Sequence, residues 1–147
     1  MTAREYILFV YDSLMTGEDQ HERLAAARPL GEATTASEYE LVDLGATGAL
    51  LAGGTAAIVG ELYALEAAAL APIDVYKGHP VLHQRTGIRL ADGREAQAYL
   101  LAPDQTAGRR RIRSGDWRQR PGAPGAQKPQ EPGALARWAK RRFDTPR

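Results

Sequence analysis

Cysteine is absent from the 147 residues, which excludes disulfides, reactive thiolates and thiolate metal sites. Histidine occurs only three times, which does not argue for a metal site. No apolar run reaches the length of a membrane span, and the N-terminal Met-Thr-Ala-Arg-Glu lacks the apolar segment of a secretory signal. Phosphate-binding loops, nucleophile elbows and dinucleotide fingerprints are also missing. We therefore expect a cytoplasmic protein that uses no membrane, metal or organic cofactor.

The composition is that of an ordinary globular domain, with 44% hydrophobic and 25% charged residues. A net charge of +1 hides an asymmetry between two parts of the chain. Residues 1–103 hold 7 Lys/Arg and 14 Asp/Glu, whereas residues 104–147 hold 12 and 4. The basic C-terminal region could attract an acidic partner or carrier protein, with nucleic acid the less favoured choice, or could lie against its own acidic body.

Strands outnumber helices in the first hundred residues. Apolar and alternating runs predict strands over residues 6–10, 38–44 and 56–63, with Gly60 marking a bulge or a close backbone approach. Asp92-Gly93 predicts a tight hairpin between strands over 83–90 and 95–101. The glycine-rich segments 45–48 and 52–54 are expected to be loops.

Helices are expected to be short. Thr16 to Asp19 has the form of a capping box and predicts a helix over 17–27. Residues 66–71 favour a second helix, which Pro72 limits and Gly78 ends. The pattern predicts a mixed α/β (α+β) domain over residues 1–120 whose sheet curls towards a barrel. Residues 121–147 are expected to form a basic linker and a possible closing helix over 134–143.

Two segments resemble the γ-glutamylcyclotransferase-like (AIG2-like) family: Phe9-Val-Tyr-Asp-Ser-Leu14 and Ala71-Pro-Ile-Asp-Val-Tyr-Lys-Gly-His-Pro-Val-Leu-His-Gln-Arg85. Members usually carry a Tyr-Gly-Ser-Leu turn and a Leu-Asp-x-x-Glu-Gly-x-Pro-x-x-Tyr-x-Arg segment whose glutamate shuttles a proton. The resemblance covers roughly residues 6–120. It implies a small barrel of five to six strands flanked by short helices, with the active pocket at one end.

Three positions depart from the family pattern: Asp12 replaces the turn glycine, Lys77 the glutamate and His83 the tyrosine. In the family the turn receives a substrate carboxylate, which Asp12 would repel by about 4 kcal/mol at 4 Å and an effective dielectric of 20. Asp12 could instead point to solvent or cap its own turn. Lys77 stays protonated unless burial or a cation lowers its pKa, and could also be a charged residue at the pocket rim.

The exchanges at positions 12 and 77 are opposite in sign, so we expect an ion pair if both face one pocket. Such a pair would either move the proton-transferring carboxylate to Asp12 or fill the site with a structural salt bridge. His83 is the other candidate for proton transfer, because imidazole titrates near neutral pH, although a lone strand histidine is more often structural.

The resemblance implies that Tyr11, Ser13 and Leu14 position a substrate. Glu61 and Arg85 should border the pocket, Arg85 as a carboxylate anchor, although they could equally pair with each other or with Asp74 as scaffold.

The leading hypothesis is an enzyme that acts on a small molecule through altered chemistry. Intramolecular attack or elimination would give a cyclised product or a released amine, with Asp12 or His83 moving the proton and Lys77 stabilising charge. A cyclase or lyase tailoring step in specialised metabolism would suit it, by analogy only. The alternative is a non-catalytic protein that binds a ligand or partner on the same scaffold.

Overall fold

The computed structural model describes residues 4–122. Contacts divide the chain into one unit that ends at Trp117 and another that begins at Arg118. All the strands of the described residues and the α-helix lie in the first unit. The helix expected over 134–143 and most of the expected linker lie outside the described residues.

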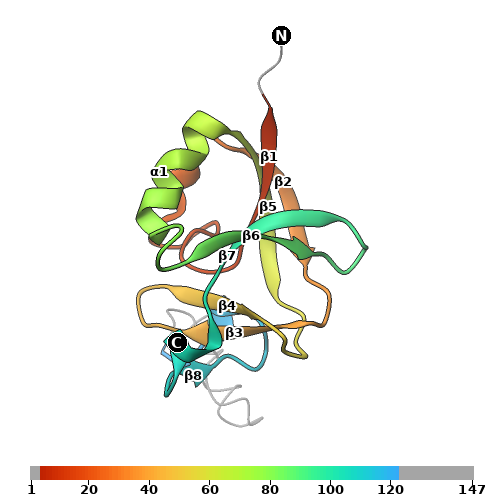
Figure 1. Cartoon of the computed structure of the whole chain (residues 1–147). Helices are drawn as coiled ribbons and strands as arrows, with labels where there is room; N and C mark the ends of the chain where they lie inside the picture. The colour runs from red at the N-terminus through yellow and green to blue at the C-terminus, as the bar shows by residue number, and fades with distance from the viewer. Residues whose placement is uncertain (1–3, 123–147) are drawn as a thin grey trace, which may run out of the picture. The chain divides into compact units, whose positions relative to one another are not determined.

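One curled sheet organises this unit (Figure 1). Its eight strands follow the order β2-β5-β1-β7-β4-β3-β8, with β6 paired to β7. Figure 1 shows β1, β2 and β5 running lengthwise while β3 and β4 lie crosswise, so the sheet bends into part of a barrel. This confirms the mixed α+β class. The strand bounds are β1 Glu5–Val10, β2 Arg28–Thr34, β3 Tyr39–Asp43, β4 Gly48–Ala52, β5 Val59–Glu66, β6 Gln84–Arg89, β7 Glu95–Leu100 and β8 Arg110–Arg111.

Most neighbouring strands are antiparallel, but β7 runs parallel to both β1 and β4. The β6–β7 hairpin confirms the expectation from Asp92-Gly93, and Gly93 adopts the left-handed φ of 91° that such a turn favours. Gly60 confirms the expected close approach, since a Cβ there would lie 2.3 Å from the Val10 carbonyl oxygen.

The single α-helix among residues 4–122 is α1, Ala67–Lys77. Three short 3₁₀ segments accompany it: η1 His21–Leu24, η2 Pro103–Thr106 and η3 Trp117–Gln119. Leu70 and Ile73 bury one face of α1 in the core. The helix continues through Pro72, against expectation, and ends as expected at Gly78, whose φ of 73° only glycine adopts readily. Lys77, the last helical residue, is buried.

The structure differs from other local expectations as well. Residues 17–27 form turns and η1 rather than a helix, and the Thr16 hydroxyl bonds to Glu61 instead of capping one. The strand expected over 56–63 is present as β5, with its bounds shifted to Val59–Glu66. The glycine-rich segment 45–48, which was expected to be a loop, contains the first residue of β4, Gly48, whose Cα lies close to the Trp117 ring.

No helix among residues 4–122 combines the length and the apolar character needed to cross a bilayer. The functional candidates gather where β1, β4 and α1 converge. The loop after β1 carries Asp12, the approach to β4 carries Thr47, and the last turn of α1 carries Lys77.

Candidate functional site

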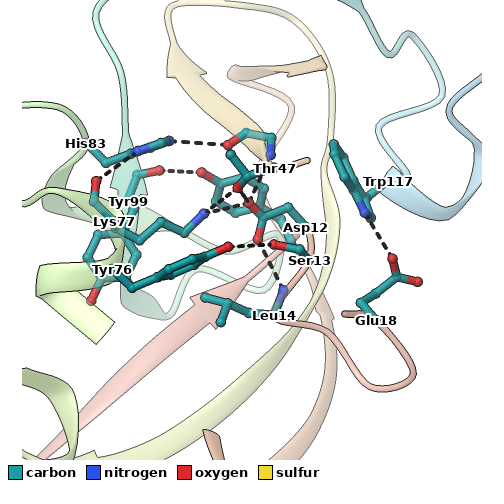
Figure 2. Close-up of polar contacts among 12 residues, drawn as sticks. Asp12, Ser13, Leu14, Glu18, Thr47, Tyr76, Lys77, His83, Tyr99 and Trp117 are labelled. Atoms are coloured by element: carbon teal, nitrogen blue, oxygen red, sulfur yellow. Dashed lines mark hydrogen bonds and ion pairs between the residues drawn. The ribbon is translucent and has the colours of Figure 1, made fainter. Parts of the chain in front are cut away.

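Asp12 and Lys77 form a buried ion pair (Figure 2). The Lys77 Nζ lies 2.5 Å from the Asp12 Oδ2, and only 2% and 1% of the two side chains are exposed. The opposite charges at these two positions therefore do meet, although they are 65 residues apart in sequence.

The Asp12 carboxylate receives further hydrogen bonds. The Thr47 hydroxyl donates to Oδ2 at 2.5 Å, the Gly48 N–H donates to Oδ2 at 3.0 Å, and the Leu14 N–H approaches Oδ1 at 3.4 Å. Thr47 also accepts a hydrogen bond from the Lys77 Nζ at 3.1 Å, so its hydroxyl bridges the two charges. The Asp12 Oδ2 is thus paired with a charge and with two further donors inside the protein, the kind of compensation that a buried ion pair requires.

These contacts decide the protonation of Asp12. Burial alone would raise the pKa of its carboxyl, but the Lys77 ammonium and the hydrogen bonds from Lys77, Thr47 and Gly48 hold that pKa below its usual value. Asp12 is therefore an ionised acceptor at neutral pH.

Aromatic rings enclose the ammonium group. The Lys77 Nζ lies 5.5 Å from the centroid of the Tyr11 ring and 5.9 Å from that of Tyr76, within the range of cation–π attraction. The Tyr11 hydroxyl donates to the Tyr99 carbonyl at 2.6 Å, and the Tyr76 and Ser13 hydroxyl oxygens lie 3.3 Å apart. Burial and the neighbouring Asp12 charge raise the pKa of Tyr11, so it remains a neutral phenol.

Trp117 closes the opposite side of Asp12. Its side chain is fully buried, and its indole N–H donates to the Glu18 carboxylate at 3.1 Å (Figure 2). A Cβ added at Gly48 would lie 3.0 Å from the Trp117 ring and 3.3 Å from the Asp12 Cβ. The space around the carboxylate is therefore closely packed.

His83 borders the same cluster through the backbone. Its Nδ1 lies 3.2 Å from the Lys77 carbonyl oxygen, and its Nε2 lies 3.2 Å from the Gly48 carbonyl oxygen. A neutral imidazole donates only one proton, so it satisfies one of these acceptors, whereas the imidazolium satisfies both. Burial and the Lys77 charge nevertheless lower the pKa of His83, against the opposing effect of the two carbonyls.

Two other candidate residues are anchored elsewhere. The Glu61 Oε1 accepts hydrogen bonds from the Thr16 N–H at 2.9 Å and the Tyr63 hydroxyl at 2.9 Å, beside a small cavity of about 120 Å³. Arg85 forms a bidentate pair with Asp74, at 2.9 and 3.1 Å. Of the alternatives for Arg85, the structure thus contains the scaffold pair with Asp74.

The site also contains residues that the sequence analysis did not select. Thr47 and Gly48 lie in a segment that was expected to be a loop, and the sequence predicts no role for Tyr76. The available signal was a hydroxyl residue beside a glycine directly before an apolar run, a place where a strand can begin.

His79 and His83 are four residues apart, a spacing that places two metal ligands on one face when it occurs in a helix. Here both residues follow the end of α1, and the His79 Nδ1 accepts the Arg85 N–H at 2.9 Å. No group of three or more potential ligands gathers among residues 4–122.

Comparison with known proteins places this geometry in a family. The family model for γ-glutamyl cyclotransferase, AIG2-like, matches residues 8–119. A putative γ-glutamylcyclotransferase of Vibrio cholerae is 34% identical over 116 residues, which cover 79% of this chain and 98% of that protein. The chain therefore belongs to the AIG2-like γ-glutamylcyclotransferase family.

Solved structures agree with this assignment. A uropathogenic Escherichia coli protein, c4763, superposes with a TM-score of 0.69 at 26% identity, covering 80% of this chain and 94% of its own. The E. coli protein YtfP is 29% identical with a TM-score of 0.59, covering 76% and 95%. A mouse AIG2-like protein, at 23% identity and a TM-score of 0.59 over 71% and 81%, shares the fold.

Proposed function

We propose that this γ-glutamylcyclotransferase-like protein lacks standard γ-glutamyl turnover and acts by binding a ligand or partner. The observation that carries the proposal is the buried pair between Asp12 and Lys77. By the resemblance described above, the pair occupies the positions of the turn glycine and the proton-transferring glutamate.

The protonation states of the pair argue against proton transfer. A group that shuttles a proton works best with a pKa near the working pH. Asp12 is held ionised by its neighbours, which makes it a weak base. Its side chain is 1% exposed, so a substrate could reach it only after the cluster opened.

His83 does not replace the missing group in this arrangement. Its side chain is buried, and each ring nitrogen faces a backbone carbonyl. To move a proton to a substrate, the imidazole would have to break its contacts with the carbonyl oxygens of Lys77 and Gly48. The described cluster thus supports a structural centre better than a catalytic one.

A second function, an enzyme with altered chemistry, is favoured by one feature. Thr47 links Asp12 to Lys77, and His83 lies against the backbone of Lys77, so acidic, basic and hydroxyl groups are contiguous. If substrate binding separated the pair, Lys77 would become an electrostatic group and Asp12 or His83 a proton carrier. Cyclisation or elimination on a small molecule, as a tailoring step in specialised metabolism, would then be feasible.

The double variant Asp12→Gly/Lys77→Glu tests both proposals, because it restores the family's residue types at positions 12 and 77 and keeps His83. We expect no 5-oxoproline release from γ-glutamyl amines by the unmodified chain, and measurable release by the double variant. Lys77→Glu alone should be inactive, since it buries two carboxylates side by side. Circular dichroism of each variant separates misfolding from inactivity.

Turnover by the unmodified chain would overturn the leading proposal. A folded but inactive double variant, together with loss of a native activity in Asp12→Ala, would favour the altered enzyme.

A further inference from the structure

A strip of arginines lies beside β8, at one edge of the sheet. Four of the five residues 109–113 are arginine, and Arg109, Arg110 and Arg113 are exposed. Like charges at such short spacing repel one another, so the strip carries an electrostatic cost.

Residues 4–122 compensate little of this charge. Arg111 pairs with Glu40 at 3.2 Å, but Arg109, Arg110 and Arg113 form no ion pair with residues 4–122. Asp43 lies opposite Arg110 in the β3–β8 register, yet its carboxylate accepts the Gly45 N–H at 2.8 Å. Elsewhere in the described chain, four arginines pair with acidic residues: Arg28, Arg85, Arg89 and Arg94.

A cavity of about 300 Å³ adjoins the strip. Its apolar lining comes from Leu41, Ala56 and Ile112, and its polar lining includes the Arg111–Glu40 pair and Arg113. The volume is enough for an apolar side chain, and the unpaired guanidinium of Arg113 stands beside it. Guanidinium groups bind carboxylates through two parallel hydrogen bonds.

We propose that this surface docks an acidic segment of a partner protein, with an apolar side chain in the cavity and carboxylates on Arg113 and Arg110. A protein segment fits better than nucleic acid for two reasons. Residues 109–113 provide no aromatic ring on which bases could stack. The apolar lining of the cavity, from Leu41, Ala56 and Ile112, suits an aliphatic side chain better than a sugar or a phosphate.

None of these residues belongs to the Asp12–Lys77 cluster, so the proposal does not depend on the function proposed for that cluster. It adds a surface and a partner chemistry that the family resemblance does not provide.

Fluorescence anisotropy of the full chain tests the proposal with a fluorescein-labelled peptide of repeated Asp-Glu-Leu. Arg110→Ala/Arg113→Ala should weaken binding by about tenfold or more, because it removes both of the proposed charge-assisted contacts. Arg89→Ala/Arg94→Ala is the matched control, because it removes the same charge from two exposed arginines of the β6–β7 hairpin and should leave the affinity within about twofold.

Two further probes separate the possible ligands. An oligo-aspartate of equal charge should bind more weakly than the leucine-containing peptide, because it cannot fill the cavity. Equal weakening by both double variants, or no binding of the peptide, would overturn the proposal. Tighter binding of an oligouridylate of equal charge would overturn it in favour of a nucleic-acid partner.

Discussion

The side chains of Asp12 and Lys77 illustrate how a charge can be buried without loss of the fold. Moving an isolated charge out of water costs several kcal/mol, and this cost is offset only by close pairing and complete hydrogen bonding. Here the pair is direct, the Thr47 hydroxyl bridges it and the Gly48 N–H adds a further donor. Each residue therefore depends on the other, and a single substitution leaves the partner uncompensated.

The stability of the protein should fall as the pH drops below about 6.5, in part because of His83. In the unfolded chain this histidine takes up a proton near pH 6.5, whereas burial and Lys77 lower its pKa in the folded protein. The unfolded state thus binds the proton more strongly. The contribution of His83 to stability is therefore complete above its pKa in the unfolded chain. It is lost as the pH falls towards the lower pKa of the folded protein.

Urea unfolding of the unmodified chain and of His83→Asn, from about pH 7.5 to about pH 5, measures this effect. The variant should lose less stability over that range. An equal or steeper loss in His83→Asn would show that His83 is not the group responsible.

At the scale of elements, two attachments bring the parts of the site together. β1, which leads into the Asp12 turn, is held to β5 by a continuous antiparallel register from Glu5↔Glu66 to Val10↔Glu61. α1, which carries Lys77, is held to the β6–β7 hairpin by the Asp74–Arg85 pair, and the Tyr99 hydroxyl also donates to Asp74 at 2.6 Å. The ion pair forms because these elements hold both side chains at fixed positions.

Gly60→Ala should be strongly destabilising, because a Cβ there would lie 2.3 Å from the Val10 carbonyl oxygen and 2.5 Å from the Phe9 ring. Backbone cannot move aside as a flexible side chain can, so we expect a loss of about 2 kcal/mol or more in the free energy of unfolding. Gly87→Ala in β6 is the matched control. No atom lies within 4 Å of its added Cβ, and its effect should stay within about 0.5 kcal/mol. Similar losses in both variants would contradict the close approach of β1 and β5.

For the whole molecule, the sequence correctly predicted those features that are set by neighbouring residues or by the family pattern. Asp92-Gly93 correctly predicted the hairpin, and the opposite charges at positions 12 and 77 correctly predicted a pair. The prediction of a helix over 17–27 was wrong because the Thr16 N–H and hydroxyl donate to the Glu61 carboxylate on β5. This contact forms only in the folded chain. The role of Thr47 could not be predicted for the same reason. Its hydrogen-bond partners, Asp12 and Lys77, lie 35 and 30 positions away in the sequence.

The account rests on Asp12 and Lys77 acting as one structural unit, and a double-mutant cycle of the free energy of unfolding tests this most directly. Asp12→Asn and Lys77→Met should each destabilise the protein by about 3–5 kcal/mol, because each leaves a buried charge unpaired. The double variant should lose less than the sum of the two by about 2 kcal/mol or more. Losses that add within about 0.5 kcal/mol would contradict the account, since the two side chains would then not be coupled.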